Sequence, residues 1–268
     1  MKKTAFILIL VFLLFYPEKT LGDLPESFQK KKPELLMKII QAGVSEEFAN
    51  TILSDRRLTY YADFFQKKDG ITNQFDPTFG IFKKDSIKKG SRVMKEKESI
   101  LSKVYERYGV QSEYLVSIYW VESRLGTNLG KRLVINSLLT LALSNSRRAE
   151  WAEKELVTFI KICYKQNFNP FLIPGSWAGA FGHMQFIPSS YVNFAVSGNG
   201  NGEGKIDLFN FEDAIFSAGN YLYRNGWDKN DLKKIKKAIF AYNHSINYVT
   251  AVMIYAWFIK PPSVCEGD

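Results

Sequence analysis

The stretch YLVSIYWVESRLGTNLGK, residues 114–131, places a carboxylate on an otherwise apolar surface. Leu115, Ile118, Tyr119 and Glu122 follow the spacing of three and four residues that puts side chains on one face of a helix. A carboxylate removed from water is costly unless it is protonated, paired or used. The setting of Glu122 therefore requires either a structural or a chemical explanation.

Two interpretations of Glu122 follow from its neighbours. In the first, Glu122 pairs with Arg124 or caps nearby backbone, and its position alone favours this structural role. In the second, burial against Ile118, Tyr119 and Trp120 favours the neutral acid and raises its pKa. A carboxylic acid with a raised pKa can act as a general acid near neutral pH. The motifs elsewhere in the chain reverse the odds towards the second interpretation.

The first 22 residues are expected to be a secretory signal peptide rather than part of the fold. Lys2 and Lys3 precede the apolar run AFILILVFLLFY, and small residues follow before a possible cleavage site after Gly22. The run is shorter than the roughly 20 residues that a spanning helix needs. We therefore expect a periplasmic or secreted protein associated with the cell envelope, with an uncleaved N-terminal anchor as the alternative. No cysteine follows the run, which disfavours lipid attachment there.

Composition limits the classes of partner. The chain has 268 residues with 46% hydrophobic content, enough to bury a sizeable core in one or two domains. The net charge is +9, with basic clusters at 30–32, 83–97 and 233–237. Such charge suits nucleic acid, anionic lipid or an anionic wall polymer, or simply solvated helix faces. Export makes nucleic acid the least favoured of these partners.

Cysteine and histidine are too sparse to build a disulfide framework or a zinc site. The two cysteines are Cys163, expected to be buried, and Cys265 in the C-terminal tail. The two histidines, His183 and His244, do not stand at metal-ligand spacing.

The hydrophobic spacing predicts a mainly helical chain. Two amphipathic helices are expected on either side of Gly43, and a charged helix over 85–108 should end at Gly109. The glycine-rich segment from Ser197 to Asn210 is interpreted as a turn or short hairpin. Further predictions cover the rest of the chain: a loop over 59–82, a buried helix after Gly109, two helices over 136–166 around a turn at 144–146, an ordered loop over 167–196, and helical spacing from 211 to 227 and from 233 to 260.

Four motifs occur in an order that resembles a known family. They are VSIYWVESRLG (116–126), GSWAGAFGHMQFIPSSY (175–191), IDLFNFEDAIFSAGNYLYRNGW (206–227) and AYNHSINYVTAV (241–252). The chain resembles the membrane-bound lytic murein transglycosylase B family of the lysozyme-like superfamily, of glycoside hydrolase family 103 type. The likeness extends from about residue 33 to 258 and is strongest between 104 and 255.

The resemblance implies an α+β lysozyme-like fold, with a helical catalytic core, a small β-hairpin and an N-terminal helical region. The expected divisions of the chain are a signal peptide at 1–22, the N-terminal helical region at 23–100, the catalytic domain at 101–260 and a tail at 261–268.

The resemblance also implies that the protein cleaves the β-1,4 bond between N-acetylmuramic acid and N-acetylglucosamine in peptidoglycan. Glu122 matches the family's single acid/base, which protonates the leaving oxygen and then takes the proton of the muramyl 6-hydroxyl as a 1,6-anhydro ring closes. The alternatives are a hydrolytic muramidase and an inactive peptidoglycan-binding protein.

Most glycosidases use two carboxylates, so a glycosidase of that kind would carry a second one besides Glu122. Glu150 and Glu155 are interpreted as surface residues of a charged helix, and Glu203 and Asp207 lie in the glycine-rich turn. None has an apolar setting like that of Glu122.

The same resemblance implies a set of substrate-binding residues. Those matching sugar-binding or cleft-lining positions are Ser176, Gln185, Phe186, Tyr242, Asn243 and Tyr248. The alternative for Phe186 is plain core packing, and for the residues near 243–248 it is helix surface and core. His183, Met184 and His244 are assigned no role.

Some relatives carry a calcium loop at the position of the glycine-rich turn. The corresponding donors here would be Asn199, Asn201, Glu203, the carbonyl of Lys205, and Asn210. Calcium loops usually carry several Asp and end in a bidentate Glu, so we expect no cofactor, with weakly bound calcium as the alternative. The expected partners are peptidoglycan glycan strands and no nucleic acid, with membrane contact only through a retained leader and the oligomeric state left open.

Overall fold

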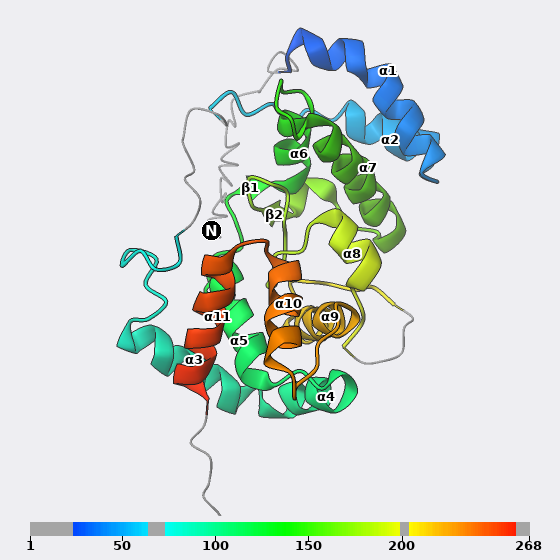
Figure 1. Ribbon diagram of the computed structural model, residues 1–268. Coiled ribbons are helices and arrows are strands. Elements are labelled where there is room, and N and C mark those ends of the chain that lie inside the picture. The colour runs from blue at the N-terminus through cyan, green and yellow to red at the C-terminus, as the bar shows by residue number, and fades with distance from the viewer. Residues whose placement is uncertain (1–23, 64–72, 199–203, 261–268) are drawn as a thin grey trace, which may run out of the picture.

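The computed structural model describes residues 24–63, 73–198 and 204–260. The expected signal peptide and the whole of the expected tail, including Cys265, lie outside these residues. The described chain is mainly helical with one small antiparallel sheet (Figure 1). Its elements are α1 (Glu26–Gln41), α2 (Glu46–Leu53), α3 (Lys84–Glu96), α4 (Glu98–Tyr108), α5 (Ser112–Ser123), β1 (Arg132–Leu133), α6 (Val134–Ala142), α7 (Ala149–Gln166), the 3-10 helix η2 (Pro170–Leu172), β2 (Pro174–Gly175), α8 (Pro188–Phe194), α9 (Phe211–Arg224), α10 (Leu232–Tyr242) and α11 (Ile246–Ile259).

The two predicted N-terminal helices are confirmed as α1 and α2. Gly43 between them has φ +90°, a left-handed conformation that favours glycine. Ser45 begins α2, and its side chain accepts a hydrogen bond from the backbone N–H of Phe48. In Figure 1 both helices lie at one end of the molecule, where α1 packs on α7.

A buried carboxylate joins α1 to α7. Glu153 is only 7% exposed and forms ion pairs with Lys31 and Lys38, both of which come from α1. Burying a carboxylate is tolerated when it is paired in this way. This ion-pair cluster fixes the N-terminal helices to the body of the fold.

The charged helix expected over 85–108 is two helices, α3 and α4, separated at Lys97. The end at Gly109 is as predicted, with φ +68°. The break has a packing reason, because α3 lies against α5 and α11 while α4 lies against α9. Close approach of α3 to α11 depends on Gly90, where an added Cβ would come within 2.4 Å of the Tyr255 hydroxyl.

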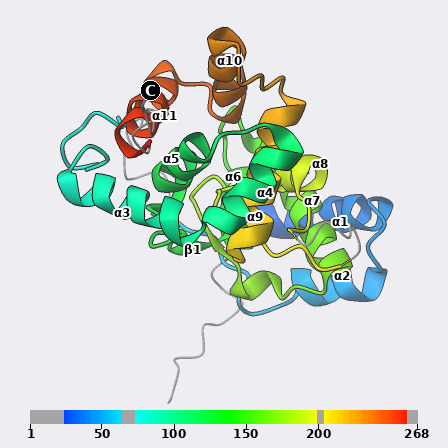
Figure 2. The same ribbon diagram turned by 90° about the horizontal axis from the view of Figure 1, so that it is seen from below.

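The predicted buried helix after Gly109 is α5, and it packs against α11 (Figure 2). Residues 115–120 of α5 are all buried. One continuous hydrophobic cluster extends from Phe28 in α1 to Ile259 in α11, across the boundary expected at residue 100. That boundary therefore stays a prediction.

The small β element is present but lies elsewhere in the chain than expected. β1 pairs with β2 in antiparallel register, Arg132 opposite Gly175 and Leu133 opposite Pro174. In the described part of the glycine-rich segment the predicted hairpin is wrong, since residues 197–198 and 204–210 contain no strand. There, Asp213 in the first turn of α9 accepts backbone N–H groups from Gly198 and Asp207, both at 2.8 Å, so the backbone groups are satisfied without strand pairing.

The predicted ordered loop over 167–196 contains three short elements, η2, β2 and α8. Helix α8 begins with Pro188, a residue that suits the first helical position. The carboxylate of Glu155 accepts the backbone N–H of Ser189 at 2.8 Å, and Glu155 is 4% exposed. The expectation that Glu155 is a surface residue is therefore wrong, whereas Glu150 is exposed as expected.

Two further sequence expectations concern burial and membrane crossing. Cys163 is buried and free, as expected of a small core residue. Among the described residues, no helix combines the length and the apolar character that membrane crossing requires.

Candidate active site

The packing of α5 on α11 brings Glu122 to Tyr248. Glu122 lies in the last turn of α5 and Tyr248 in the first turn of α11, 126 residues further along the chain. The Tyr248 hydroxyl donates a hydrogen bond of 2.6 Å to Oε1 of Glu122. Tyr248 is fully buried, and Ser245 fixes the start of its helix by accepting the Tyr248 backbone N–H.

The surroundings of Glu122 raise its pKa from 4.5 to about 7. Removal of the carboxylate from water is the larger effect and disfavours the charged form, while the hydrogen bond from Tyr248 opposes it. Glu122 lies deep in the molecule yet keeps part of its surface accessible to solvent. A carboxyl group of this kind is protonated in a large fraction of molecules at neutral pH and can exchange its proton with a ligand.

Arg124 does not neutralise Glu122. Helix α5 ends in two residues with left-handed backbone, Arg124 at φ 51° and Leu125 at φ 57°. The Arg124 guanidinium lies over the rings of Phe79 and Trp120, at 5.3 and 5.5 Å from their centroids. Within the described part of the chain Glu122 has no ion-pair partner, which removes the structural interpretation based on Arg124.

Tyr242 forms the next layer behind Tyr248. The two rings are nearly parallel, with centroids 6.5 Å apart and an interplanar angle of 7°. The Tyr242 hydroxyl donates to the backbone carbonyl of Met184 at 2.7 Å. Burial and the nearby charge of Glu122 raise the pKa of Tyr242 well above its ordinary value, so this hydroxyl stays a proton donor. Tyr242 thereby connects α10 to the segment 181–186.

The segment around residues 176–186 is held in shape by its own hydrogen bonds. Ser176 Oγ accepts the backbone N–H of Ala180 at 3.0 Å. Gln185 has φ 48°, uncommon for a residue with a side chain, and its Nε2 donates to the Gly182 carbonyl at 2.8 Å. Gly182 has φ +77° and no room for a Cβ beside Leu208.

The predicted site residues differ in burial and in whether they contact Glu122. Phe186 is 2% exposed and packs against Tyr221 and Tyr242, which is the core packing that the sequence left open. Asn243 is exposed at the C-terminal end of α10. Tyr248 contacts Glu122 directly. The sugar-binding roles of Ser176, Gln185, Phe186, Tyr242, Asn243 and Tyr248 stay predictions.

His183 and Tyr119 form a contact that sequence reasoning did not assign. Their rings meet edge to face at 5.5 Å, and Gly126 is so close that an added Cβ would collide with both. Burial lowers the pKa of His183, which keeps its imidazole neutral, and its Nδ1 is buried without a hydrogen-bond partner. Burial also raises the pKa of Tyr119 to about 12. These side chains support the face of α5 that carries Glu122.

The described residues fit a calcium ion poorly. Asn199, Asn201 and Glu203 lie outside the described residues. Asn210 Oδ1 is already used as the N-cap of α9, accepting the backbone N–H groups of Glu212 and Asp213. Among the residues that the structure describes, no group of three or more His, Cys, Asp or Glu side chains could hold a metal ion.

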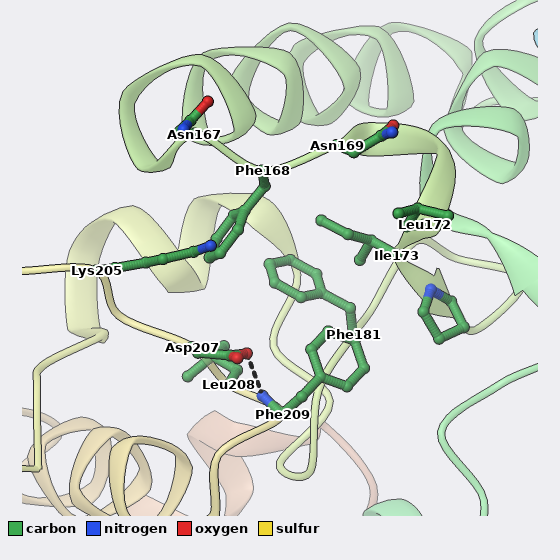
Figure 3. Close-up of a pocket in the computed structure, with 11 residues that line it drawn as sticks. Asn167, Phe168, Asn169, Leu172, Ile173, Phe181, Lys205, Asp207, Leu208 and Phe209 are labelled. Carbon is green, nitrogen blue, oxygen red and sulfur yellow. Dashed lines mark hydrogen bonds between the residues drawn. The ribbon is translucent and has the colours of Figure 1, made fainter.

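A separate cavity of about 290 Å³ lies beside the 205–209 segment (Figure 3). Phe181, Ile173 and Leu208 give it apolar walls, and the Lys205 amine lies over the Phe168 ring at 4.5 Å. None of the residues that line this cavity is a predicted catalytic or substrate-binding residue. It is distinct from the Glu122 site.

Comparison with known proteins identifies the family. A family model described as "Transglycosylase SLT domain" matches residues 27–236, most of the chain. The chain belongs to this family. The recognition based on the four motifs is thereby confirmed.

A curated relative is similar over the central part of the chain. Membrane-bound lytic murein transglycosylase B of Escherichia coli (strain K12) is 38% identical over 147 residues, which is 55% of this chain. The matched stretch spans only 40% of the length of that relative.

Solved structures agree in fold over a larger share. A 36 kDa muramidase/transglycosylase is 25% identical, with a TM-score of 0.76 over 85% of this chain and 93% of that one. The Escherichia coli lytic transglycosylase SLT35 in complex with calcium gives 24% identity and a TM-score of 0.75, over 85% and 92% of the two chains. SltB3 from Pseudomonas aeruginosa, in complex with NAG-anhNAM-pentapeptide, is 22% identical, with a TM-score of 0.76 over 87% of this chain and 79% of that one. The lysozyme-like lytic transglycosylase fold expected from the sequence is confirmed.

Proposed function

We propose that this protein is a lytic transglycosylase that cleaves the bond between N-acetylmuramic acid and N-acetylglucosamine in peptidoglycan. The observation that carries the proposal is the Glu122–Tyr248 pair, in which burial raises the pKa of the carboxyl to about 7. Membership of the transglycosylase family supports the same assignment.

The chemistry begins with Glu122 in its protonated form. Glu122 gives its proton to the leaving glycosidic oxygen as the bond breaks, and the muramyl acetamido group supports the positive charge that develops at the sugar carbon. The resulting carboxylate is stabilised by the hydrogen bond from Tyr248. Glu122 then takes the proton of the muramyl 6-hydroxyl while that oxygen closes the 1,6-anhydro ring. The attacking hydroxyl is tethered to the reacting sugar, so its positional entropy is already lost before the step.

A mechanism with one carboxylate is supported by the engagement of three of the four other candidates, the fourth, Glu203, lying outside the described residues. Glu155 binds the N–H of Ser189, Glu150 pairs with Lys154, and Asp207 accepts the N–H of Phe209. A double-displacement glycosidase would need a second carboxylate across the sugar from Glu122. A hydrolytic muramidase shares the same acid, so it remains the second candidate.

The localisation and architecture belong to the proposal as well. We assign the protein to the cell envelope, where its substrate lies, which agrees with the membrane-bound relative from Escherichia coli. Residues 1–22 would direct export, residues 23–100 would support the core, and residues 101–260 would carry the catalytic machinery. Peptidoglycan glycan strands are the partner, contacted by Ser176, Gln185, Tyr242 and Asn243.

The proposal is tested by incubating purified peptidoglycan with the protein and with its Glu122→Gln variant. Release of soluble muropeptides by the parent protein and not by the variant is the expected result. Binding to peptidoglycan without release by either protein would contradict the proposal and leave a wall-binding protein.

A further inference from the structure

Helix α11 has two sides in different surroundings. Its inner side is buried in the core and carries Tyr248, the residue that contacts the catalytic carboxylate. Its outer side carries Ile246, Thr250, Met253 and Trp257, whose spacing of three and four residues puts them on one helical face. Ile246 and Trp257 are 71% and 72% exposed. The proposed chemistry does not use this outer side.

The outer side of α11 borders two apolar hollows that share Met253. A hollow of about 590 Å³ lies between α10 and α11, and one of about 420 Å³ lies towards the end of α11. Leu232, which is 53% exposed, and Phe240 line the first hollow, whereas Trp257 and Phe258 line the second. Figure 2 shows α10 and α11 at one edge of the molecule. Exposed apolar side chains therefore follow α11 along its length.

Lysine side chains border the same hollows. Lys236 and Lys237 line the first, which has no carboxylate in its lining, and Lys260 lines the second together with Glu113. Lys233 is exposed on the same helix as Lys236 and Lys237. Within the described part of the chain, none of these four lysines forms an ion pair. The surface thus combines exposed apolar groups with positive charge that no carboxylate of the protein pairs.

The acidic residues next to α10 in the sequence are engaged elsewhere. Asp231 is the N-cap of α10 and accepts the backbone N–H groups of Lys233 and Lys234, while Asp228 pairs with the Lys234 amine. Helix α11 contributes no charged residue from Ile246 to Ile259. Helical surfaces that join exposed Trp, Phe and Leu to lysines are typical of proteins that bind the interface of an anionic bilayer.

We propose that this α10–α11 surface, formed by Leu232, Lys236, Lys237, Phe240, Ile246 and Trp257, docks on an anionic lipid bilayer. A soluble polyanion would engage the lysines and leave the apolar side chains in water. An uncharged glycan would leave the lysines without a counter-charge. A bilayer with acidic headgroups satisfies both groups, because the apolar side chains enter the headgroup region while the lysines contact phosphate.

The contact is with the surface of the bilayer. Among the described residues no helix is long and apolar enough to cross a membrane, and the exposed side chains lie along α11 instead of at its tip. The inference depends neither on an N-terminal leader nor on the proposed function.

Quenching of tryptophan fluorescence by lipid tests the contact at a single residue. The probe is a vesicle of phosphatidylcholine with about one third phosphatidylglycerol, in which some acyl chains carry bromine. We expect quenching of the full chain, and Trp257→Phe should lose most of it while still binding, because phenylalanine keeps the apolar contact. The matched control Trp177→Phe removes a tryptophan that is 42% exposed beside Arg148, and it should keep the quenching of the parent protein.

The charge of the surface is tested by vesicle sedimentation. Lys236→Gln/Lys237→Gln should lower the affinity for the same vesicles roughly ten- to thirtyfold, since each lysine near an anionic bilayer contributes to binding. The matched control is Lys161→Gln/Lys165→Gln on α7, a helix that packs on α1, α6 and α8, and it should bind like the parent protein. Vesicles of phosphatidylcholine alone should bind the parent protein more weakly than the anionic vesicles.

The outcomes that overturn the inference are specific. Vesicle binding without quenching at Trp257 would mean that another part of the chain, such as the leader, makes the contact. Equal loss of affinity in the α10 variant and the α7 control would mean that only net charge matters. Binding to soluble polyglycerol phosphate without binding to vesicles would indicate a polyanion as the partner. A dimer that Trp257→Asp abolishes, together with no vesicle binding, would assign the surface to a second copy of the chain.

Discussion

Tyr248 donates a 2.6 Å hydrogen bond to the one carboxylate, Glu122, that lies at the end of the buried helix α5. This contact opposes burial in setting the pKa of Glu122. Burial favours the neutral acid, the hydrogen bond favours the carboxylate, and the balance is a pKa raised to about 7. The pair therefore suits a group that must first give and then take a proton.

Removing the Tyr248 hydroxyl should change the pH profile. In Tyr248→Phe the carboxylate loses its donor, so the pKa of Glu122 rises further and the alkaline limb of kcat/KM moves to higher pH. The rate should fall by about tenfold, because the anion formed after proton donation loses a hydrogen bond of about 1–2 kcal/mol. The Tyr242→Phe variant is the control, since its hydroxyl bonds the Met184 carbonyl instead of Glu122. An alkaline limb that moves equally in both variants would contradict this role of Tyr248.

The raised pKa of Glu122 also predicts a pH-dependent cost in stability. Between pH 4.5 and 7 the folded protein holds a proton on Glu122 that the unfolded chain has lost, so the stability due to this group declines as pH rises through that window. Glu122→Gln removes the titration. We compare the unfolding free energy of Glu122→Gln with that of the parent protein at the same pH. The variant minus the parent should increase by about 2–3 kcal/mol from pH 4 to pH 8. Denaturant unfolding at both pH values measures this difference, in which the other titrating groups cancel. The same difference at both pH values would mean that the pKa of Glu122 is not raised.

The buried carboxylate of Glu155 should matter for stability and for the site. Glu155→Ala leaves the Ser189 N–H without its partner at the start of α8, which directly follows the 176–187 segment. We expect a loss of about 1–3 kcal/mol in unfolding free energy and a higher KM. Glu150→Ala, on the exposed side of the same helix, should change stability by less than about 0.5 kcal/mol. Equal effects of the two substitutions in thermal unfolding would argue against an anchoring role for Glu155.

The close contact at the two-stranded sheet should make Gly130 intolerant of a side chain. A Cβ at Gly130 would lie 1.9 Å from the Gly175 carbonyl oxygen, in a backbone with φ +96°. Gly130→Ala is expected to abolish folding or to lower the melting temperature severely. Gly226 has a similar φ of +85° but open space around it, so Gly226→Ala should cost only about 1 kcal/mol. Comparable melting temperatures for the two variants would contradict this steric explanation.

Much of this fold could be predicted because its helices carry strong local signals. Ser45, Gly43 and Gly109 mark helix ends by capping and by left-handed backbone, and the apolar spacing around Glu122 predicted a buried helix. The break at Lys97 could not be predicted in this way. It depends on which neighbours α3 and α4 pack against, and these lie far away in the sequence.

The error at Glu155 has a different cause. Ala152, Glu155, Phe159 and Cys163 lie on one helical face, the same kind of spacing that singled out Glu122. The charged residues next to Glu155 in the sequence led to the prediction of an exposed position, in spite of this apolar spacing. Asp213, which satisfies Gly198 and Asp207, stands three residues after the helix cap Asn210, a position where acidic residues favour a helix start. The contact between Glu122 and Tyr248 joins residues 126 positions apart, so only the resemblance to a family could suggest it in advance.

Mass spectrometry of the muropeptides released from purified peptidoglycan tests the central claim most directly. Ring closure by the muramyl 6-hydroxyl consumes no water, so the account predicts products lighter by one water than fragments with ordinary reducing ends, and none from Glu122→Gln. Fragments with free reducing ends throughout would contradict the account, because they would show that water, and not the 6-hydroxyl, attacks the sugar beside Glu122.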